Sequence, residues 1–392
     1  MRLNKDVVAF HDEMADWRRD IHQHPEIAFE ERRTSDFVAG KLEEFGLEVH
    51  RGLAKTGVVG TLRSNSNAGA RAIGLRADMD ALPLQEHNTF DYRSVNDGKM
   101  HACGHDGHTA MLLGAARLLA KTKEFAGTIH FIFQPAEETG VGGRDMVREG
   151  LFDRFPMEAV YGMHNFPGIE VGRFAMRKGP LMAATDTFEL TIKGVGGHGA
   201  FPHTSRDPIV TAAQIISAWQ TITSRETDPL QSAAVTVTQI HGGDTTNVIP
   251  EEVVLAGTTR SFDTQIQDGI ESAMERIADG VCSAMRLDCV LRYERRNPVT
   301  VNSATETDIA AAAAARVVGG GNVDTDAPPV MGGEDFAWML REKPGCYVLI
   351  GNGIDSDGGC MLHNPQFDFN DAILPIGASY WVELVRAILP QT

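Results

Sequence analysis

The chain opens with helical spacing of its apolar residues and then changes to short apolar runs. The first spaced set is Val7, Phe10, Met14, Trp17 and Ile21. This spacing predicts one amphipathic helix that Pro25 stops. A second helical pattern covers about residues 33 to 45 and ends at Gly46, a residue that favours the left-handed conformation after a helix.

From about residue 50 to residue 182, apolar runs alternate with helical segments. The runs predicted as strands are "TGVVGTL", "RAIGLRAD", "GTIHFIFQ" and "EAVYGMH". Between them, "HTAMLLGAARLLAK" and "GGRDMVREG" have helical spacing. Alternation of this kind predicts an α/β domain with a mostly parallel sheet.

The pattern changes again in residues 183–296. "DTFELTIKG" alternates as a half-exposed strand, and the following segments predict the order β-α-β-β-α-β, which is a ferredoxin-like sandwich. After residue 297 the α/β pattern returns with "ATETDIAAAAAARVV" and "CYVLIGNG". We therefore expect a discontinuous domain, residues 1–182 and 297–392, that carries residues 183–296 as an insertion.

Length and charge narrow the class of protein. A chain of 392 residues exceeds what one core usually supports, which agrees with two domains. The net charge of -17 excludes nucleic acid and an anionic membrane surface as partners. If the substrate is an anion, a local positive group has to reverse the field at the site.

We also expect no targeting signal in this sequence. Its first 17 residues carry acids and no unbroken apolar run, so we expect no signal peptide. No run approaches the ~20 apolar residues of a membrane span. The five cysteines are odd in number and sparse, which predicts a reducing, cytoplasmic environment.

Two short stretches carry candidate metal chemistry. In "HACGHDGHTAML", Cys103 and His105 can face one point from an extended loop, although these residues alone fit a crowded helix start equally well. In "FIFQPAEETG", Glu137 and Glu138 follow an apolar strand and point in opposite directions. One can bind a metal while the other reaches a water molecule. The alternative is a solvated acidic turn, but the carboxyl end of a buried strand favours a site.

Two later histidines extend the set. His164 ends the strand in "VYGMHNFPG", and His363 follows the glycine-rich "GNGIDSDGG". The candidate ligands are then Cys103, His105, Glu138, His164 and His363. Five ligands are too many for one tetrahedral zinc ion with an open position, whereas two divalent ions would use them and would supply the positive charge.

Motifs along nearly the whole chain resemble those of a known family. They are "RRDIHQHPE", "RADMDALP", "HACGHDGHTAMLLG", "QPAEE", "GMHN", "GGHGAFPH", "TNVIP", "GGEDF" and "MLHNP". In this combination and order the chain is similar to the aminoacylase/carboxypeptidase family of metallopeptidases, family M-twenty. The subgroup it resembles contains hippurate hydrolases, N-acyl-amino-acid amidohydrolases and plant auxin-conjugate hydrolases.

The resemblance implies a role for most of these residues. The five candidate ligands match the family's two-metal ligands, Glu137 matches its general base, and Asp80 matches an aspartate that orients the site. Asp78 stands where the broader family has a histidine, and Cys103 enters the ligand set instead. That departure leaves zinc, manganese, nickel and cobalt as candidate ions.

The inserted segment resembles the family's lid and dimerisation domain, which implies a homodimer or tetramer. His198 matches a histidine that stabilises the oxyanion in the partner's active site. Asn247 and Arg260 match positions associated with the substrate carboxylate, a group that arginine binds bidentately. The resemblance does not decide whether Glu334 or Asp335 in "GGEDF" takes part in the chemistry.

The expected activity is hydrolysis of the amide bond of N-acyl amino acids, such as hippurate or N-acetyl amino acids. Two other enzymes fit the same residues: a small-peptide carboxypeptidase or dipeptidase, and an N-acetyl-diaminopimelate-type deacetylase. A non-catalytic descendant that binds metal or a small acid is disfavoured, because every matched position is filled.

Overall fold

The computed structural model describes residues 1–64, 71–355 and 358–391. This part of the chain forms two compact units. The first contains Met1–Leu181, Thr300–Pro329 and the residues from Asp335 to the C-terminus, and the second contains Met182–Val299 and Val330–Glu334. The segment Val330–Glu334 joins the second unit although it follows the expected insertion by more than thirty residues.

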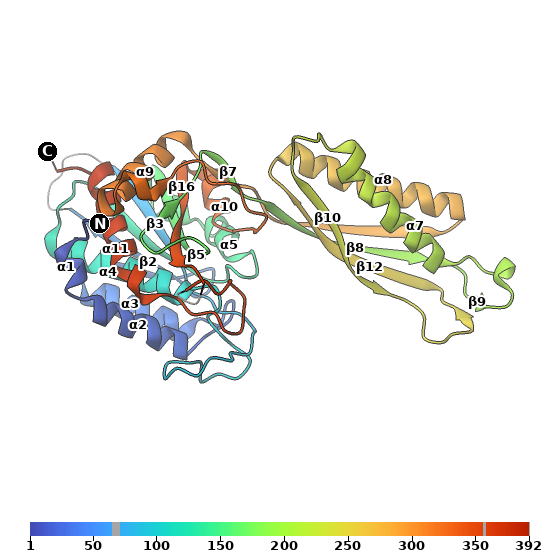
Figure 1. Cartoon of the computed structure of the whole chain (residues 1–392), viewed down its shortest axis with the longest axis horizontal. Coiled ribbons are helices and arrows are strands. Elements are labelled where there is room, and N and C mark those ends of the chain that lie inside the picture. The colour runs from blue at the N-terminus through green and yellow to red at the C-terminus, as the bar shows by residue number, and fades with distance from the viewer. Residues whose placement is uncertain (65–70, 356–357, 392) are drawn as a thin grey trace. The chain divides into compact units, whose positions relative to one another are not determined.

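A mixed eight-stranded sheet forms the centre of the first unit (Figure 1). Its strands, in spatial order, are β1 (Glu48–Leu53), β2 (Gly57–Arg63), β4 (Thr128–Gln134), β3 (Ala72–Asp78), β5 (Ala159–Pro167), β16 (Gly345–Gly353), β6 (Phe174–Ala175) and β15 (Val323–Asp324). The four central strands β4, β3, β5 and β16 are parallel neighbours, whereas β1, β2 and β6 pair antiparallel. The expected α/β domain is confirmed, and its sheet is mixed, with the parallel strands at the centre.

Helices cover both faces of this sheet. They are α1 (Lys5–Val8), α2 (His11–Gln23), α3 (Arg32–Glu44), α4 (His105–Thr122), α5 (Gly142–Arg148), α6 (Leu151–Arg154), α9 (Ala304–Val318), α10 (Ala337–Glu342) and α11 (Leu374–Ile388). Short 3₁₀ turns are η3 (Gly320–Asn322) and η4 (Asp371–Ile373), and β7 (Gly179–Met182) pairs with β14 (Thr300–Asn302). Side chains alternate along β3: Leu75 enters the core that contains α4 and α11, whereas Arg76 points to the other face and meets Asp335 just before α10.

The N-terminal helix differs from the prediction. The chain leaves the helical conformation at Phe10, whose φ is -118° and ψ 27°, so α1 and α2 are separate helices. Asn4 caps α1 through its side chain. Phe10 instead packs its ring beneath the guanidinium of Arg117, 4.8 Å away. The apolar spacing continues across the break, which is why the sequence predicted one helix there.

The second unit is an antiparallel four-stranded sheet with two helices. Its elements are β8 (Ala184–Lys193), α7 (Pro208–Thr221), β10 (Ala233–His241), β12 (Glu252–Ser261), α8 (Thr264–Met285) and β13 (Asp288–Asn297). The strand order is β10-β12-β8-β13, and α7 and α8 pack on one face (Figure 1). The expected ferredoxin-like order is confirmed.

The second unit also contains several short elements that the sequence pattern does not predict. They are β9 (Gly197–His198), η1 (Pro202–Thr204), the π-helical turn η2 (Ile222–Glu226) and β11 (Val248–Ile249). β9 and β11 pair as a small ribbon. No helix in the described ranges is both long and apolar enough to cross a membrane.

Candidate metal centre

Four segments that lie far apart in the sequence supply the predicted ligands. Cys103 and His105 stand at the start of α4, and Glu138 follows β4. His164 lies near the end of β5, and His363 follows β16. The parallel strands bring these carboxyl ends to one edge of the sheet, where α/β proteins bind their ligands.

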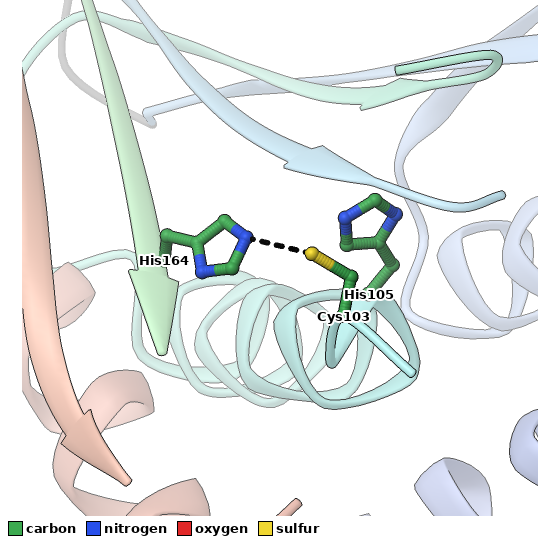
Figure 2. A group of neighbouring side chains, drawn as sticks. All are labelled: Cys103, His105 and His164. Carbon is green, nitrogen blue, oxygen red and sulfur yellow. Dashed lines mark hydrogen bonds between the residues drawn. The ribbon is translucent and has the colours of Figure 1, made fainter. Parts of the chain in front are cut away.

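The ligand atoms of these five residues form two overlapping groups. Cys103, His105 and His164 make one group, in which the ligand atoms lie within 4.8 Å of one another. Figure 2 shows this group, with Nε2 of His164 3.3 Å from Sγ of Cys103. Cys103 also joins Glu138 and His363 in a second group of the same dimension. The structure therefore brings all five predicted ligands together, and Cys103 belongs to both groups.

Backbone carbonyls orient two of the histidine rings. A carbonyl oxygen only accepts, so Nδ1–H of His164 donates to the carbonyl of Asn165 at 2.6 Å. Likewise Nδ1–H of His105 donates to the carbonyl of Asp80 at 2.8 Å. Each ring then directs Nε2 into the group. Histidines that bind a metal have this arrangement: one ring nitrogen binds the metal, and the other donates its N–H to an oxygen atom of the protein.

Two buried polar atoms lack a partner at the same place. Neither Nε2 of His105 nor Oε1 of Glu138 has a hydrogen-bond partner among the described residues, and the two atoms lie 3.9 Å apart. The other oxygen of Glu138 lies 3.4 Å from Nε2 of His363. Buried polar atoms normally have a hydrogen-bond partner, so these two atoms are suited to be donors to a metal ion. Their mixture with the Cys103 thiol suits a divalent transition-metal ion.

The charges of the site also favour a cation. Burial alone would lower the pKa of His105, but the neighbouring Asp78, Asp80 and Glu138 raise it to about 10. Burial, helped by Asp80 and opposed by His105, raises the pKa of Glu138 to about 7. The carboxylates thus draw a proton into the site. A divalent ion would supply the same positive charge without the proton.

The remaining histidines of "HACGHDGHTAML" have other surroundings. Nδ1 of His108 lies 2.6 Å from Oδ1 of Asp78, and its Nε2 lies 2.7 Å from Oδ1 of Asn165. His101 is buried, and burial lowers its pKa to about 4. Its ring centroid lies 6.2 Å from that of His22. Of the three histidines, only His105 joins the five-ligand set.

Asp78 is an ion-paired carboxylate. Its Oδ2 accepts from Nη1 of Arg76 at 2.7 Å, and its Oδ1 faces His108. Burial would raise its pKa, but the positive charges of His105 and Arg76 hold that pKa well below the usual range. Both oxygens of Asp78 are therefore engaged. This agrees with a ligand set in which Cys103, and not residue 78, is a donor.

Asp335 supports this ion pair from the other side of Arg76. Its Oδ1 accepts from Nη2 of Arg76 at 3.2 Å and from Nε2 of Gln134 at 2.6 Å, and its Oδ2 accepts from the backbone N–H of Gly143 at 2.7 Å. Asp335 thus joins β3, β4 and the start of α5. Its neighbour Glu334 is buried and belongs to the second unit.

Asp80 holds the turn that carries both glutamates. Its Oδ1 accepts from the backbone N–H of Glu137, and its Oδ2 from the backbone N–H of Glu138, each at 3.0 Å. The ligand atoms of His105, Glu137 and Glu138 lie within 4.8 Å of one another. The two glutamates are therefore oriented by one buried carboxylate, and Glu137 stands beside the proposed ligands.

The three remaining predicted site residues lie in the second unit. His198 on β9 is exposed, and its Nδ1 accepts from the backbone N–H of Ala200. Asn247 is exposed before β11, and its carbonyl accepts from the N–H of Gly199. Arg260 on β12 is half-buried, and burial lowers its pKa. Its guanidinium donates to the hydroxyl of Thr258 and, at 2.8 Å, to the carbonyl of Thr259.

Two residues that the sequence pattern does not indicate support the turns that carry the proposed ligands. Gly104 has φ 91°, and a Cβ there would lie 2.2 Å from Oδ1 of Asn165, so the turn before His105 requires glycine. Glu31 is wholly buried and accepts from the backbone N–H of Ala136. It lies in "AFEERR", a charged run that is typical of an exposed helix start, so the sequence carries no signal of its burial.

Comparisons with known proteins show which proteins the chain is similar to. Residues 74–387 match the model of the family described as Peptidase family M20/M25/M40. The hippurate hydrolase of Campylobacter jejuni is 38% identical over 389 residues, covering 99% of this chain and 100% of the relative. Thermostable carboxypeptidase 2 of Saccharolobus solfataricus is 38% identical over 384 residues, covering 96% of this chain and 95% of the relative.

A solved structure extends the likeness to three dimensions. The YXEP protein of Bacillus subtilis, described as a dinuclear metal binding peptidase from the M20 family, superposes with a TM-score of 0.84 at 35% identity. The match covers 97% of this chain and 99% of that one.

Proposed function

The chain belongs to peptidase family M20/M25/M40, and on that premise we propose that it is a metal-dependent amidohydrolase of N-acyl amino acids. The observation that carries the proposal is the convergence of five metal-binding side chains beside one further buried carboxylate, Glu137. The relative named hippurate hydrolase supports the substrate class, because it matches this chain from end to end.

Glu137 is the proposed general base. When bound, two divalent ions would acidify a water molecule and polarise the acyl carbonyl. The Glu137 carboxylate would accept a proton from that water and return it to the leaving amine nitrogen, which yields a carboxylic acid and a free amino acid. Asp80 accepts a hydrogen bond from the backbone N–H of Glu137 and so fixes the backbone from which the proposed base extends.

The metal ligands in this proposal are Cys103, His105, Glu138, His164 and His363. The two imidazoles whose remote nitrogens are held by carbonyls support it, as do the unpartnered atoms of His105 and Glu138. A thiol among nitrogen and oxygen donors favours zinc, nickel and cobalt, and manganese is the further candidate that the family resemblance implies.

A substrate panel tests the activity. After loading with Mn²⁺, the chain is expected to hydrolyse N-benzoylglycine and N-acetyl-methionine, and to lose that activity to a chelator. Faster turnover of simple dipeptides than of both acyl amino acids would favour the carboxypeptidase alternative, which the relative from Saccharolobus solfataricus supports. Preference for N-acetyl-diaminopimelate would favour a deacetylase of that type. Hydrolysis of none of these compounds would contradict the proposed function.

Arg260 and Asn247 are the proposed contacts to the substrate's free carboxylate. Arg260 supports this role because its guanidinium donates only to neutral oxygens in the described structure. A half-buried guanidinium that donates only to neutral oxygens is suited to bind an incoming anion. This local positive group would hold an anionic substrate in a protein of net charge -17.

We propose a homodimer, or a tetramer built from it, through the second unit. Large apolar side chains are exposed there: Phe201, Ile209, Val210, Ile240 and Val248. The edge strand β10 also leaves one side of its backbone unpaired within this sheet. In the dimer, His198 would stabilise the oxyanion in the partner's site.

Sedimentation of the variant Ile240→Lys tests this assembly. Because the substitution places a charge among exposed apolar side chains, we expect monomers in place of dimers, together with loss of hydrolysis. The matched substitution Val290→Lys on the opposite edge strand β13, where Val290 is equally exposed, should leave the dimer intact. A wild-type chain that sediments as an active monomer would contradict both the dimer and the role of His198.

The cytoplasm is the proposed location. No disulfide joins any of the five cysteines in the described residues, and the proposed ligand Cys103 requires a reduced thiol.

A further inference from the structure

The turn "QPAEE" is held by two buried carboxylates. Three consecutive backbone N–H groups point at them: that of Ala136 donates to Oε1 of Glu31 at 2.9 Å, and those of Glu137 and Glu138 donate to Asp80. Ala136, whose backbone N–H is held by Glu31, therefore directly precedes the proposed base and its neighbouring ligand.

Glu31 is wholly buried, and its own carboxyl group accepts three hydrogen bonds. Oε1 accepts from the backbone N–H of Phe29 at 3.0 Å as well as from Ala136. Oε2 accepts from the hydroxyl of Thr56 at 2.6 Å. The carboxyl thus ties the start of α3 and the turn between β1 and β2 to the turn after β4.

Both residues that donate backbone N–H groups to Oε1 are strained. Phe29 has φ 64° and Ala136 has φ 54°, the left-handed region that side chains other than glycine rarely adopt. Such residues persist where the surrounding structure over-determines them, and they cluster at functional sites. Glu31 is the side chain that satisfies the N–H of both residues.

We propose that Glu31 is a positioning residue of the reaction, which fixes Ala136 in its left-handed conformation and thereby aims Glu137 and Glu138. The proposal rests on the proposed function, because Glu137 is the base and Glu138 the ligand being aimed. The role requires a side chain as long as glutamate at position 31, because one oxygen atom has to accept from the N–H groups of both Phe29 and Ala136.

Charge is not what this contact needs. Burial raises the pKa of Glu31 to about 7, so the neutral form is accessible near neutral pH. In that form Oε1 still accepts, while the protonated Oε2 donates to Thr56. A glutamine has the same reach and the same pair of roles, with its amide N–H₂ directed at Thr56.

Glu26 provides a matched control in the same loop. Its carboxylate also accepts three hydrogen bonds, from the backbone N–H groups of Arg33 and Thr34 and from the Thr34 hydroxyl. All three lie at the start of α3. Shortening Glu26 therefore removes comparable local bonds without touching the turn at Ala136.

The experiment compares Glu31→Asp, Glu31→Gln and Glu26→Asp in the full chain. For each we would measure kcat with N-benzoylglycine at full Mn²⁺ loading and, separately, the Mn²⁺ dissociation constant by competition with a chelator. Glu31→Asp should lower kcat about tenfold or more and weaken Mn²⁺ binding roughly 10–100-fold, the range for residues that orient a ligand. Glu31→Gln and Glu26→Asp should resemble the wild type in both.

Two results would overturn the proposal. Equal losses in Glu31→Asp and Glu26→Asp would show that general destabilisation of the loop is responsible. A tenfold loss in Glu31→Gln would show that the contact needs the charge of the carboxylate, which contradicts a role of reach alone, and this variant gives that answer even if Glu31→Asp does not fold. Failure of the proposed function is separate: it would appear as absent hydrolysis in the wild type, while the Mn²⁺ binding measurements still test Glu31.

Discussion

Substitution of Glu137 by glutamine is expected to reduce kcat by at least ~100-fold while the metal content stays unchanged. Glutamine has the same size and keeps the backbone N–H that donates to Asp80, but its amide cannot accept a proton at neutral pH. The loss should appear in kcat, with little change in KM, because the proton transfer occurs only on the way to the transition state. Steady-state kinetics together with elemental analysis of the same sample provide the measurement.

The neighbouring substitution Glu138→Gln is the matched control. It makes the same chemical change one residue further along, where the carboxylate lies 3.4 Å from His363 and belongs to a ligand group. We expect Glu138→Gln to lose metal and Glu137→Gln to keep it. Near-normal turnover in Glu137→Gln, or equal metal loss in both variants, would remove Glu137 from the role of base.

The second large effect is expected for Cys103. Removal of its thiol in Cys103→Ala withdraws a donor from both three-residue groups, so both metal equivalents should bind more weakly. We expect a loss of affinity above about 100-fold, beyond the range for a residue that only supports a ligand. Activity at micromolar metal should fall with it, and excess metal should restore part of it. Calorimetric titration of the metal-free chain measures both sites.

The other ligands should divide between the two sites. His164→Ala affects only the group that contains His105, and His363→Ala affects only the group that contains Glu138. Each variant should therefore retain one tight equivalent. Cys346→Ala, which removes another buried cysteine of the same unit, should retain both. Full metal binding in Cys103→Ala would contradict the arrangement of two groups that share this thiol.

The proposed ligands could be picked out in the sequence because they lie at predictable places. Glu138 and His164 follow or end apolar strands, and the carboxyl ends of parallel strands meet at one edge of the sheet. Cys103 and His105 precede a strongly helical segment with glycine between them. Alternating apolar runs also predicted the order of strands and helices in both units.

Other parts of the site depend on contacts that spacing does not encode. Glu31 lies more than 100 residues from Ala136, and its surroundings are charged, so nothing in the pattern predicts that it is buried. His108 has the same spacing signal as His105, yet it faces Asp78 and Asn165. Which histidine becomes a ligand is decided by the direction of the side chain at the start of α4.

The break at Phe10 and the strained turn at Ala136 share a physical reason. Local propensity favours a continuous helix in the first case and an ordinary conformation in the second, but tertiary contacts override it in both. Arg117 lies over the Phe10 ring, and Glu31 holds the Ala136 N–H. Exceptions of this kind are expected where a fold builds its site.

Elemental analysis of active chain purified without chelators tests the paired-metal centre most directly. A paired-metal centre requires two divalent transition-metal ions per chain in samples that hydrolyse N-benzoylglycine, and activity should disappear and return as the ions are removed and replaced. Full activity in a sample without stoichiometric transition metal would contradict it.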